Sequence, residues 1–469
     1  MQIPFSERAD EALASLGCSL NPCGGLDLNA VRFTGVEPPL ATPHRIVVAS
    51  AVSAALAAAC AARRWAVARG ESQTLQIDAV QAASALEPTH FQTQQGYRMP
   101  QTSHARELKS GFYKTGDGRW FMPSGSYPHL RDGTLELLNC PNTVSALAAA
   151  IAGWSSDDLE QACADRSLPG VYARSYQEWL AHPQGLALEV KPVIEIEKIG
   201  DSPAQMARPL KRPLDDIRVL DVSHVIAGPV MARTLGEFGA NVLRVSQPSR
   251  PDPTPQILDT GIGKRNTYLD LRCTLGQTAL RALAQDADVF IQSWRPGALN
   301  ALGFSPHDLA SLRPGIIYAS VSAFGFDGPW ACRKGFDQMS QAVTGIAVAQ
   351  GGEGRPSLVP SRLLNDYLTA YLGAAGVMEA LERRAQSGGS YHVKVSLART
   401  SMWVQELGTC KTSGPFLTMD DLSPTMQTRP SPFGLLEQLA PVAILSKTPA
   451  GWVLPPYPLG SHPPSWESM

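Results

Sequence analysis

The chain has no excess of charge of either sign, because 40 Lys and Arg stand against 42 Asp and Glu for a formal net charge of -2. Binding to nucleic acid or to an anionic membrane depends on a surplus of Lys and Arg, so neither partner is expected. The eight cysteines are scattered, with no CxxC pair and no Cys and His at zinc spacing. We therefore expect free thiols in a reducing compartment and no bound metal.

The chain also has none of the features of an exported protein. Its first segment, "MQIPFSERADEALASLGCSL", contains no basic stretch followed by an apolar core. We find no uninterrupted apolar run that approaches the ~20 residues of a membrane helix. The ending "WESM" matches no retention or peroxisomal signal. We expect a cytoplasmic location and no membrane partner.

A chain of 469 residues is too long for one compact core, so two domains, or two segments that share a large one, are expected. The Pro- and charge-rich stretch "DSPAQMARPLKRPLDD" is typical of a linker. The predicted organisation is an N-terminal extension (1–40), a partial segment with a helix, a strand and a small domain (41–200), the linker (201–216), a Rossmann-like domain (217–410) and a Pro-rich C-terminal tail (411–469).

Strands and helices alternate after the linker. The predicted strands are 217–222, 240–245, 287–294 and 315–324, and the predicted helices between them include 228–239 and 274–286. Such alternation implies right-handed crossovers and a parallel sheet that is covered on both faces. We predict an α/β fold: a Rossmann-like, mostly parallel sheet with helices on both faces, plus a smaller α+β domain.

The two halves of the chain contain a weak internal repeat. Residues 53–82 parallel residues 373–400, since each segment has a helix of small residues, a pair of arginines, a glycine turn and a strand. The repeat indicates a duplicated or rearranged gene.

One acid is out of place just before the second repeat. Asp366 lies in "RLLNDYLTAYLGAAG", where the neighbours are small, aromatic or aliphatic. An Asp before a helical run is often an N-cap. An ionised carboxylate in apolar surroundings is also costly unless it is paired, so a chemical role is the alternative.

Five ordered motifs resemble the family III CoA-transferases, the group that contains formyl-CoA and carnitine CoA-transferases and α-methylacyl-CoA racemase. They are "RVLDVSHVIAGPVMARTLGEFGANVLRV", "GKRNTYLDL", "ADVFIQSWRPGALNALGF", "PGIIYASVSAFGFDGPW" and "KGFDQMSQAVTGIAVAQGG". The resemblance covers about residues 207–400, whereas the first part of the chain resembles later regions of the family. The order is thus displaced, either because the rear of one copy is fused to the front of another or because a single protein is permuted.

The resemblance implies an activity: transfer of coenzyme A between an acyl-CoA thioester and a carboxylic acid. Asp366 matches the family's catalytic Asp, which forms an acyl-aspartyl anhydride and then an aspartyl-CoA thioester. The implied coenzyme A is a substrate rather than a tightly bound cofactor, and the implied assembly is a homodimer. In the first repeat, the matching residues 42–48 ("TPHRIVV") contain no acid, so that half is expected to be catalytically silent.

The resemblance also nominates binding residues. Those implied for coenzyme A are His224, Val225, Ile226, Ala227, Leu269, Arg272, Ser293, Trp294 and Lys334, and Gly351, Gly352 and Gly354 are candidates for an oxyanion loop. Some positions depart from the family pattern. Ser246 and Gln247 replace a Glu and a basic residue, Ser293 and Trp294 replace Asn and Phe, and Ala301 replaces a basic residue.

Three other functions stay open at this point. An acyl-CoA racemase needs a second acid or base, but Phe336 occupies the place of the family racemases' His, which leaves Asp337 as a substitute. A dinucleotide-dependent reductase would need GxGxxG where the chain has "SHVIAGP". A non-catalytic binding or scaffold protein is the third alternative. The acyl donor and acceptor are not determined by these residues.

Overall fold

A seven-stranded sheet forms the centre of the computed structural model, which describes residues 4–21, 25–99, 108–109, 111–205, 210–249, 251–410 and 415–466. The strand order is β11-β10-β9-β12-β13-β14-β8. The strands are β8 (Glu195–Gly200), β9 (Arg218–Asp221), β10 (Asn241–Ser246), β11 (Lys264–Tyr268), β12 (Val289–Gln292), β13 (Ile317–Ser322) and β14 (Ser390–Ser396). All neighbours pair in parallel except β14 and β8. The predicted Rossmann-like sheet is confirmed, whereas its antiparallel edge strand β8 was not predicted.

The chain reverses direction across the sheet between β9 and β12. From β9 the sheet grows one way to β10 and β11, and from β12 it grows the other way to β13 and β14. The carboxyl ends of β9 and β12 therefore face a crevice, since their connections leave on opposite sides. The residues that follow β9 and β12 are the place to look for a ligand site.

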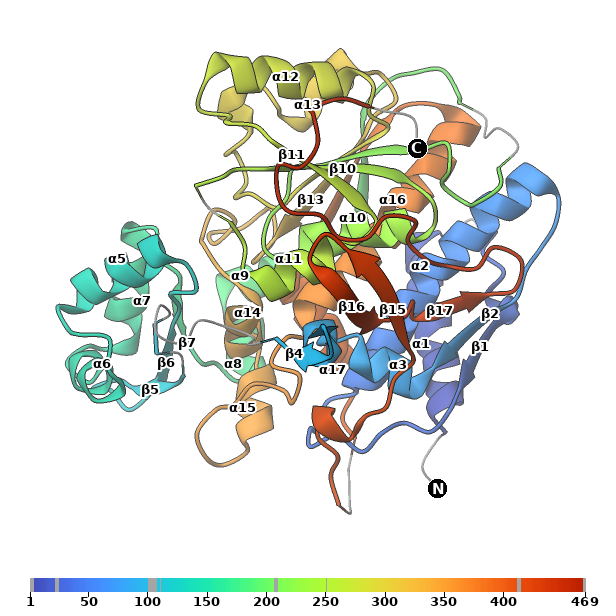
Figure 1. The fold of residues 1–469 in the computed structure, drawn as a ribbon. Helices are drawn as coiled ribbons and strands as arrows, with labels where there is room; N and C mark the ends of the chain where they lie inside the picture. Colours follow the sequence, from blue (N-terminus) through green and yellow to red (C-terminus); the bar gives the residue numbers. More distant parts are fainter. Residues whose placement is uncertain are drawn as a thin grey trace.

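Helices cover both faces of this sheet (Figure 1). One face packs α10 (Ala227–Glu237) and α16 (Asn365–Ser387) on Val219, Ile291 and other inward residues. The other face packs α12 (Thr274–Gln285) and α13 (Pro306–Leu312) on Leu220 and Phe290. Adjacent strand residues thus point to opposite faces, as the period of a strand requires. The predicted two-sided covering is confirmed.

A small lobe precedes the central sheet in the chain and lies to its side, at the left of Figure 1. It contains the sheet β5 (Tyr113–Lys114), β6 (Trp120–Pro123) and β7 (Gly170–Tyr172), with helices α5 (Pro128–Leu138), α6 (Val144–Ile151) and α7 (Ser156–Asp165). Its own core includes Phe121, Leu147 and Leu159. Helices α8 (Tyr176–Ala181) and α9 (Pro183–Glu189) then lead back towards α14 (Asp337–Val343), α15 (Ile346–Gly351) and α17 (Leu397–Glu406).

The two ends of the chain build one further layer together, at the right and lower centre of Figure 1. The N-terminal elements are α1 (Phe5–Leu20), β1 (Val31–Thr34), α2 (Ile46–Arg69), β2 (Leu75–Asp78), α3 (Ala79–Ser84), α4 (Pro88–Phe91), β3 (Thr93–Gln94) and β4 (Tyr97–Arg98). The C-terminal strands are β15 (Met426–Ser431), β16 (Gly434–Leu439) and β17 (Ala443–Leu445), of which β17 pairs with β2 and β16 with β3. Residues 415–466 thus form sheet structure as well as a Pro-rich ending. The predicted domain boundaries stay predictions.

Helix α2 corrects one expectation. It has 24 residues, and the mean hydropathy of its most apolar 18-residue window is 1.9, so it is long and apolar enough to cross a membrane, contrary to our expectation that no such run exists. In the structure 94% of its most apolar window is buried. It packs in one continuous core with α10, α16 and the central sheet. That burial is what the core helix of a large domain requires, and helix α2 alone is weak evidence for a membrane span.

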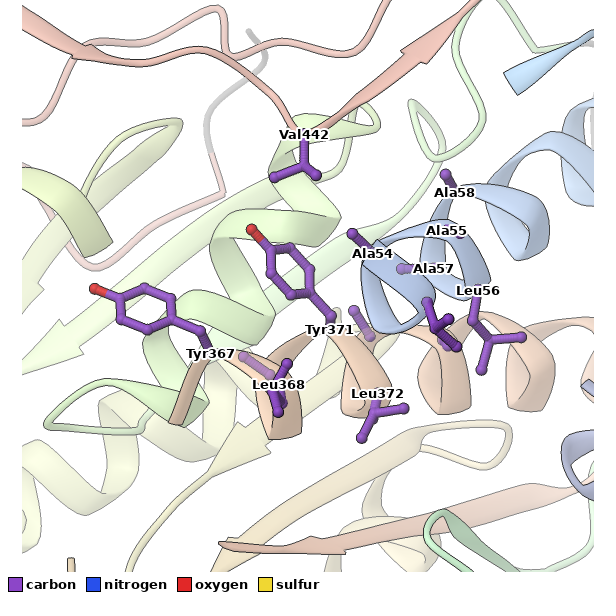
Figure 2. Close-up of a cluster of buried hydrophobic side chains, with 14 of the residues drawn as sticks. Ala54, Ala55, Leu56, Ala57, Ala58, Tyr367, Leu368, Tyr371, Leu372 and Val442 are labelled. Carbon is purple, nitrogen blue, oxygen red and sulfur yellow. The ribbon is translucent and has the colours of Figure 1, made fainter. Parts of the chain in front are cut away.

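Two tyrosines on α16 join this helix to α10 and to α11 (Thr254–Thr260). Figure 2 shows Tyr367 and Tyr371 projecting from α16 on one side, with the alanines of α2 close to the same helix. The Tyr367 hydroxyl donates to Asp259 Oδ2 at 3.0 Å, and Asp259 also binds the buried guanidinium of Arg233 on α10. Burial, with the Asp259 carboxylate beside it, raises the pKa of Tyr367, so the phenol stays neutral.

Replacing Tyr367 with Phe should lower the free energy of unfolding by about 1.5–3 kcal/mol, because Asp259 loses a buried donor to a charged acceptor. Urea titration of the variant measures this. Tyr97→Phe is the matched control, since Tyr97 is 78% exposed. Equal effects in the two variants would contradict the importance of this buried bond.

Candidate active site

A cavity of about 290 Å³ opens at the carboxyl ends of β9 and β12, where the direction of the sheet reverses. Its walls include the turn after β9, the turn after β12, the ends of β10 and β13, the segment before α14 and the start of α5 in the small lobe. The Asp366 side chain also lies on the wall. The cavity thus brings together segments that are more than 200 residues apart in the sequence.

The turn after β9 is held in a demanding conformation. Val225 has φ of 68°, in the left-handed region that a β-branched residue rarely adopts. Its N–H donates to Asp252 Oδ1 at 3.3 Å, and its carbonyl accepts from Gln256 Nε2. Such a conformation persists only where the surroundings fix it, and it is common at functional sites. The turn leads directly into the first residue of α10, Ala227.

The turn after β12 locks the same loop from the other side. The Ser293 hydroxyl donates to the His224 carbonyl and accepts from the His224 N–H, at 3.0 Å each. The indole of Trp294 packs edge-on against the His224 ring, with centroids 4.2 Å apart, and its Nε1 donates to the Val222 carbonyl at 2.7 Å. The two turns at the crevice therefore form one rigid wall.

Asp366 is the second residue of α16 and does not cap its own helix. The start of α16 has no side-chain cap from its N-cap residue, Leu364. Instead the Asp366 carboxylate accepts a hydrogen bond from the backbone N–H of Ala227, the first residue of α10. The helix-cap interpretation of Asp366 is therefore wrong. Its carboxylate faces the N-terminus of another helix, whose free N–H groups favour negative charge.

The cap of α16 is Asp337, which begins α14. Asp337 Oδ2 accepts from the N–H groups of Leu364 and Asp366, at 2.9 and 2.8 Å. Its Oδ1 accepts from Gln341 Nε2 at 2.5 Å, and the N–H of Asn365 also binds this carboxylate. Asp337 is fully buried. It thus serves α16 as an N-cap supplied by a different helix.

The carboxyl groups of Asp366 and Asp337 are therefore neighbours, and both are buried. Burial raises the pKa of Asp366 well above its usual value, and the charge of Asp337 raises it further, whereas the Ala227 N–H opposes the rise. Burial also raises the pKa of Asp337, but its four donors stabilise the ionised form. The pKa of Asp366 is therefore the more strongly raised of the two, because the four donors on Asp337 oppose the effect of burial there, whereas Asp366 has one donor and the charge of Asp337 beside it.

The small lobe contributes one wall of the cavity through Tyr127, His129 and Leu130. The Tyr127 hydroxyl donates to Asp252 Oδ1 at 2.7 Å, and Asp252 Oδ2 binds Arg244 at 2.6 Å. Asp252 therefore links the small lobe, strand β10 and the N–H of Val225. Sequence reasoning did not nominate these wall residues, because nothing local in "GSYPHLRDG" indicates which distant helix it will meet.

Positively charged side chains also line the cavity. Arg295, Arg333 and Lys334 all line the cavity, and only Lys334 was predicted. The Arg333 guanidinium lies over the Trp330 ring at 4.3 Å and 3.6 Å from Glu160 Oε2 of the small lobe. Arg295 directly follows "QSW" in the motif "ADVFIQSWRPGALNALGF". Its position just after the end of β12 could have identified it as a cavity residue from the sequence.

The predicted coenzyme A contacts divide into two groups. Those that line the cavity are His224, Val225, Ala227, Ser293, Trp294 and Lys334, together with Asp366. Ile226 and Leu269 are buried in the apolar cores instead. Arg272 is 74% exposed and pairs with Asp270 at 2.8 Å. The structure thus gives Ile226 and Leu269 packing positions and Arg272 a surface position, and none of the three lines the cavity.

The glycines proposed for an oxyanion loop also lie elsewhere. Gly351 ends α15, Gly352 follows it with φ of 62°, and Gly354 is exposed. A Cβ at Gly351 would meet Pro356 at 2.8 Å, so close packing of the turn accounts for that glycine. None of the three lines the cavity. The donor that the structure places at Asp366 is the Ala227 N–H.

Phe336 also lines the cavity and stacks on Tyr127, with ring centroids 6.3 Å apart. Phe336 therefore has a packing role at the position where the racemases that this chain resembles have a His that carries a proton. Asp337, the substitute that the sequence left open, uses its oxygens to cap α16.

Comparison with known proteins gives a consistent result. The model of CoA-transferase family III matches residues 214–432. An acetyl-coenzyme A transferase, nodX, of Hypoxylon pulicicidum is 38% identical over 207 residues, which cover 42% of this chain and 35% of that protein. The alpha subunit of a succinyl-CoA–L-malate CoA-transferase from Chloroflexus aurantiacus is 32% identical, over 39% of this chain and 46% of its own length.

Other relatives cover different lengths. An acyl-CoA transferase of Gibberella moniliformis is 28% identical over 320 residues, 62% of this chain and 56% of that protein. A crystal structure of a hypothetical protein from Mycobacterium tuberculosis is 32% identical over 42% of this chain and 58% of its own, with a TM-score of 0.39. The chain spans about half, or less, of the length of the curated relatives that it matches.

Proposed function

We propose that this chain, whose residues 214–432 match the model of CoA-transferase family III, transfers coenzyme A from an acyl-CoA thioester to a carboxylic acid. The observation that carries the proposal is the position of Asp366: a buried carboxyl on the cavity wall, bonded to the first N–H of α10. A carboxylate in a dry site, at a helix N-terminus and away from solvent, is a competent nucleophile once it is ionised.

The proposed reaction needs no external acid or base once Asp366 has lost its proton. The Asp366 carboxylate attacks the thioester carbonyl. The C–S bond then breaks, coenzyme A leaves as a thiolate, and the acyl group stays on Asp366 as an acyl-aspartyl anhydride. The thiolate then attacks the aspartyl carbonyl, which releases the donor acid and leaves aspartyl-CoA. The acceptor carboxylate attacks in turn, and the same steps in reverse give the new acyl-CoA and free Asp366.

The walls of the cavity suit the two ends of such a substrate. In this reaction the Ala227 N–H, which bonds Asp366, is the donor proposed for the oxyanion of each tetrahedral intermediate. The charges of Arg295, Arg333 and Lys334 favour the phosphates of a coenzyme A thioester. Tyr127, His129 and Leu130, from the small lobe, line the wall that is left for the acyl group and the acceptor acid.

The test is chemical trapping. We expect incubation with a panel of acyl-CoAs, followed by hydroxylamine or borohydride, to mark the peptide that contains Asp366, and the mark to vanish in Asp366→Ala. Turnover that survives Asp366→Ala would overturn the proposal. Exchange of the α-hydrogen of an acyl-CoA in D₂O without CoA transfer would indicate a racemase. A rise in melting temperature with acyl-CoA, without adduct or turnover, would indicate a binding protein.

A further inference from the structure

The internal repeat is also a repeat of structure. In the second unit, β13 and β14 pair in parallel, α16 precedes β14, and α17 begins directly after it. In the first unit, β1 and β2 pair in parallel, α2 precedes β2, and α3 begins directly after it. The long helices have 24 and 23 residues. Each short helix is capped by the last residue of its strand, Asp78 or Ser396.

The two units pack on each other through their long helices. Helices α2 and α16 belong to one continuous core, and Figure 2 shows alanines 54, 55, 57 and 58 of α2 close to α16. Residues 46–62 of α2 are buried without exception. Two copies of one unit that meet through the same element have the geometry of a symmetric dimer, here within one chain.

A symmetric contact between α2 and α16 would contain two equivalent ion pairs, and one of the two is present. Arg63 of α2 bonds Glu379 of α16 at 2.9 Å, and these side chains are 11% and 4% exposed. The register that pairs Ser53 with Gly373 pairs Arg63 with Arg383 and Ala59 with Glu379. The reciprocal bond, from Arg383 to α2, therefore has no acid to meet. Arg383 bonds Glu379 in its own helix, at 3.0 Å, and the Leu20 carbonyl instead.

The same register pairs Ile46 with Asp366. Ile46 is fully buried, so the first unit has an apolar core residue where the second has a carboxyl on a cavity. The first unit thus keeps the packing surface of the repeat and lacks its reactive group.

We propose that the first unit, β1–α2–β2–α3, is a built-in partner: a second copy that occupies the pairing face of α16 within the same chain, so that no helix from another chain is needed there. The homodimer implied by the family resemblance is replaced at this face by an intrachain contact. One consequence, which rests on the proposed function, is one reactive carboxyl per chain.

A charge exchange tests whether the contact is made within a chain. Arg63→Glu and Glu379→Arg should each lower the melting temperature by about 2–4 °C, because each places like charges together at a buried contact. The double variant in one chain should recover part of the loss, since Glu382 and Arg383 still face the exchanged charges. Co-expression of the two single variants, with different affinity tags, should give no recovery of the melting temperature.

Several outcomes decide the matter. Recovery in the co-expressed pair, with both tags in one particle, would overturn the proposal, and so would no recovery in the double variant. The milder Arg63→Gln and Glu379→Gln guard against misfolding: within one chain, their combined loss should be smaller than the sum of the two. The control exchange is Lys447 with Glu71, an exposed pair, which should change nothing.

The number of trapped adducts per chain is a second test, and its failure can be told apart from a failure of the proposed function. One adduct per chain on the Asp366 peptide, and none on residues 42–48, is expected. An adduct on both would overturn the proposal. A chain that forms no adduct at all would contradict the proposed function, while the melting temperatures would still decide where the partner of α16 comes from.

Discussion

Asp366→Asn is expected to abolish CoA transfer, by at least ~10³-fold in turnover, and to make the folded chain more stable. The amide cannot form an anhydride, yet its oxygen still accepts from the Ala227 N–H, and the repulsion by Asp337 disappears. Steady-state kinetics with the best acyl-CoA pair, and urea titration of both proteins, measure the two effects. Binding of coenzyme A, followed by calorimetry, should change little.

The stability effect has a definite dependence on pH. The pKa of Asp366 is raised in the folded chain, so the folded state binds a proton that the unfolded state has released above about pH 4. The native protein therefore loses stability as pH rises from about 4 towards the raised pKa. The advantage of Asp366→Asn should grow across that range and then level off. An advantage that is constant with pH would contradict a raised pKa of Asp366 in the folded chain.

Asp337→Ala should cause the second large change, a fall of about 3–5 kcal/mol in the free energy of unfolding. Three backbone N–H groups at the start of α16 and the Gln341 amide would lose their acceptor in a fully buried place. Chemical unfolding measures the loss. Asp308→Ala, in the exposed capping box of α13, is the matched control and should lose only ~1 kcal/mol.

Whatever activity Asp337→Ala retains should have a shifted pH profile. Asp337 raises the pKa of Asp366, so its removal should move the acid limb of the rate towards lower pH. The groups that face Asp366 are otherwise unchanged: Tyr367 on its own helix, the Ala227 N–H on α10 and Tyr127 on the small lobe. An acid limb at the same pH as in the native protein would show that another group controls it.

The sequence predicted much of this architecture because its signals were local. The predicted strands and helices of 217–324 appear in and around the central sheet with ends shifted by at most two residues, such as β12 at Val289–Gln292 for the predicted 287–294. Helix α2 and the repeat were also visible in composition. Strand β8 was missed even though "EIEKIG" alternates apolar and polar residues, because an antiparallel edge strand does not follow from the β/α alternation.

The parts of the site that could not be predicted depend on distant contacts. Asp337 caps a helix that begins 28 residues later, and "KGFDQ" carries no sign of that. Arg272 was nominated as a ligand contact, but the nearest acid, Asp270, lies two residues away and binds it. The side chain at 366 was correctly singled out as unusual, while its partner, an N–H from α10, becomes visible only when two helix N-termini meet.

The origin of the cavity walls has a consequence for changing specificity by design. On the proposed function, the reacting carboxyl of Asp366, the turn that supports it and the cationic wall all come from the second half of the chain, whereas Tyr127, His129 and Leu130 come from the first half. Acid selectivity can then be altered by exchanging a compact lobe with its own core, with the reacting carboxyl left in place. The contacts that any new lobe would have to reproduce include those of Tyr127 with Asp252 and of Arg333 with Glu160 and Gln161.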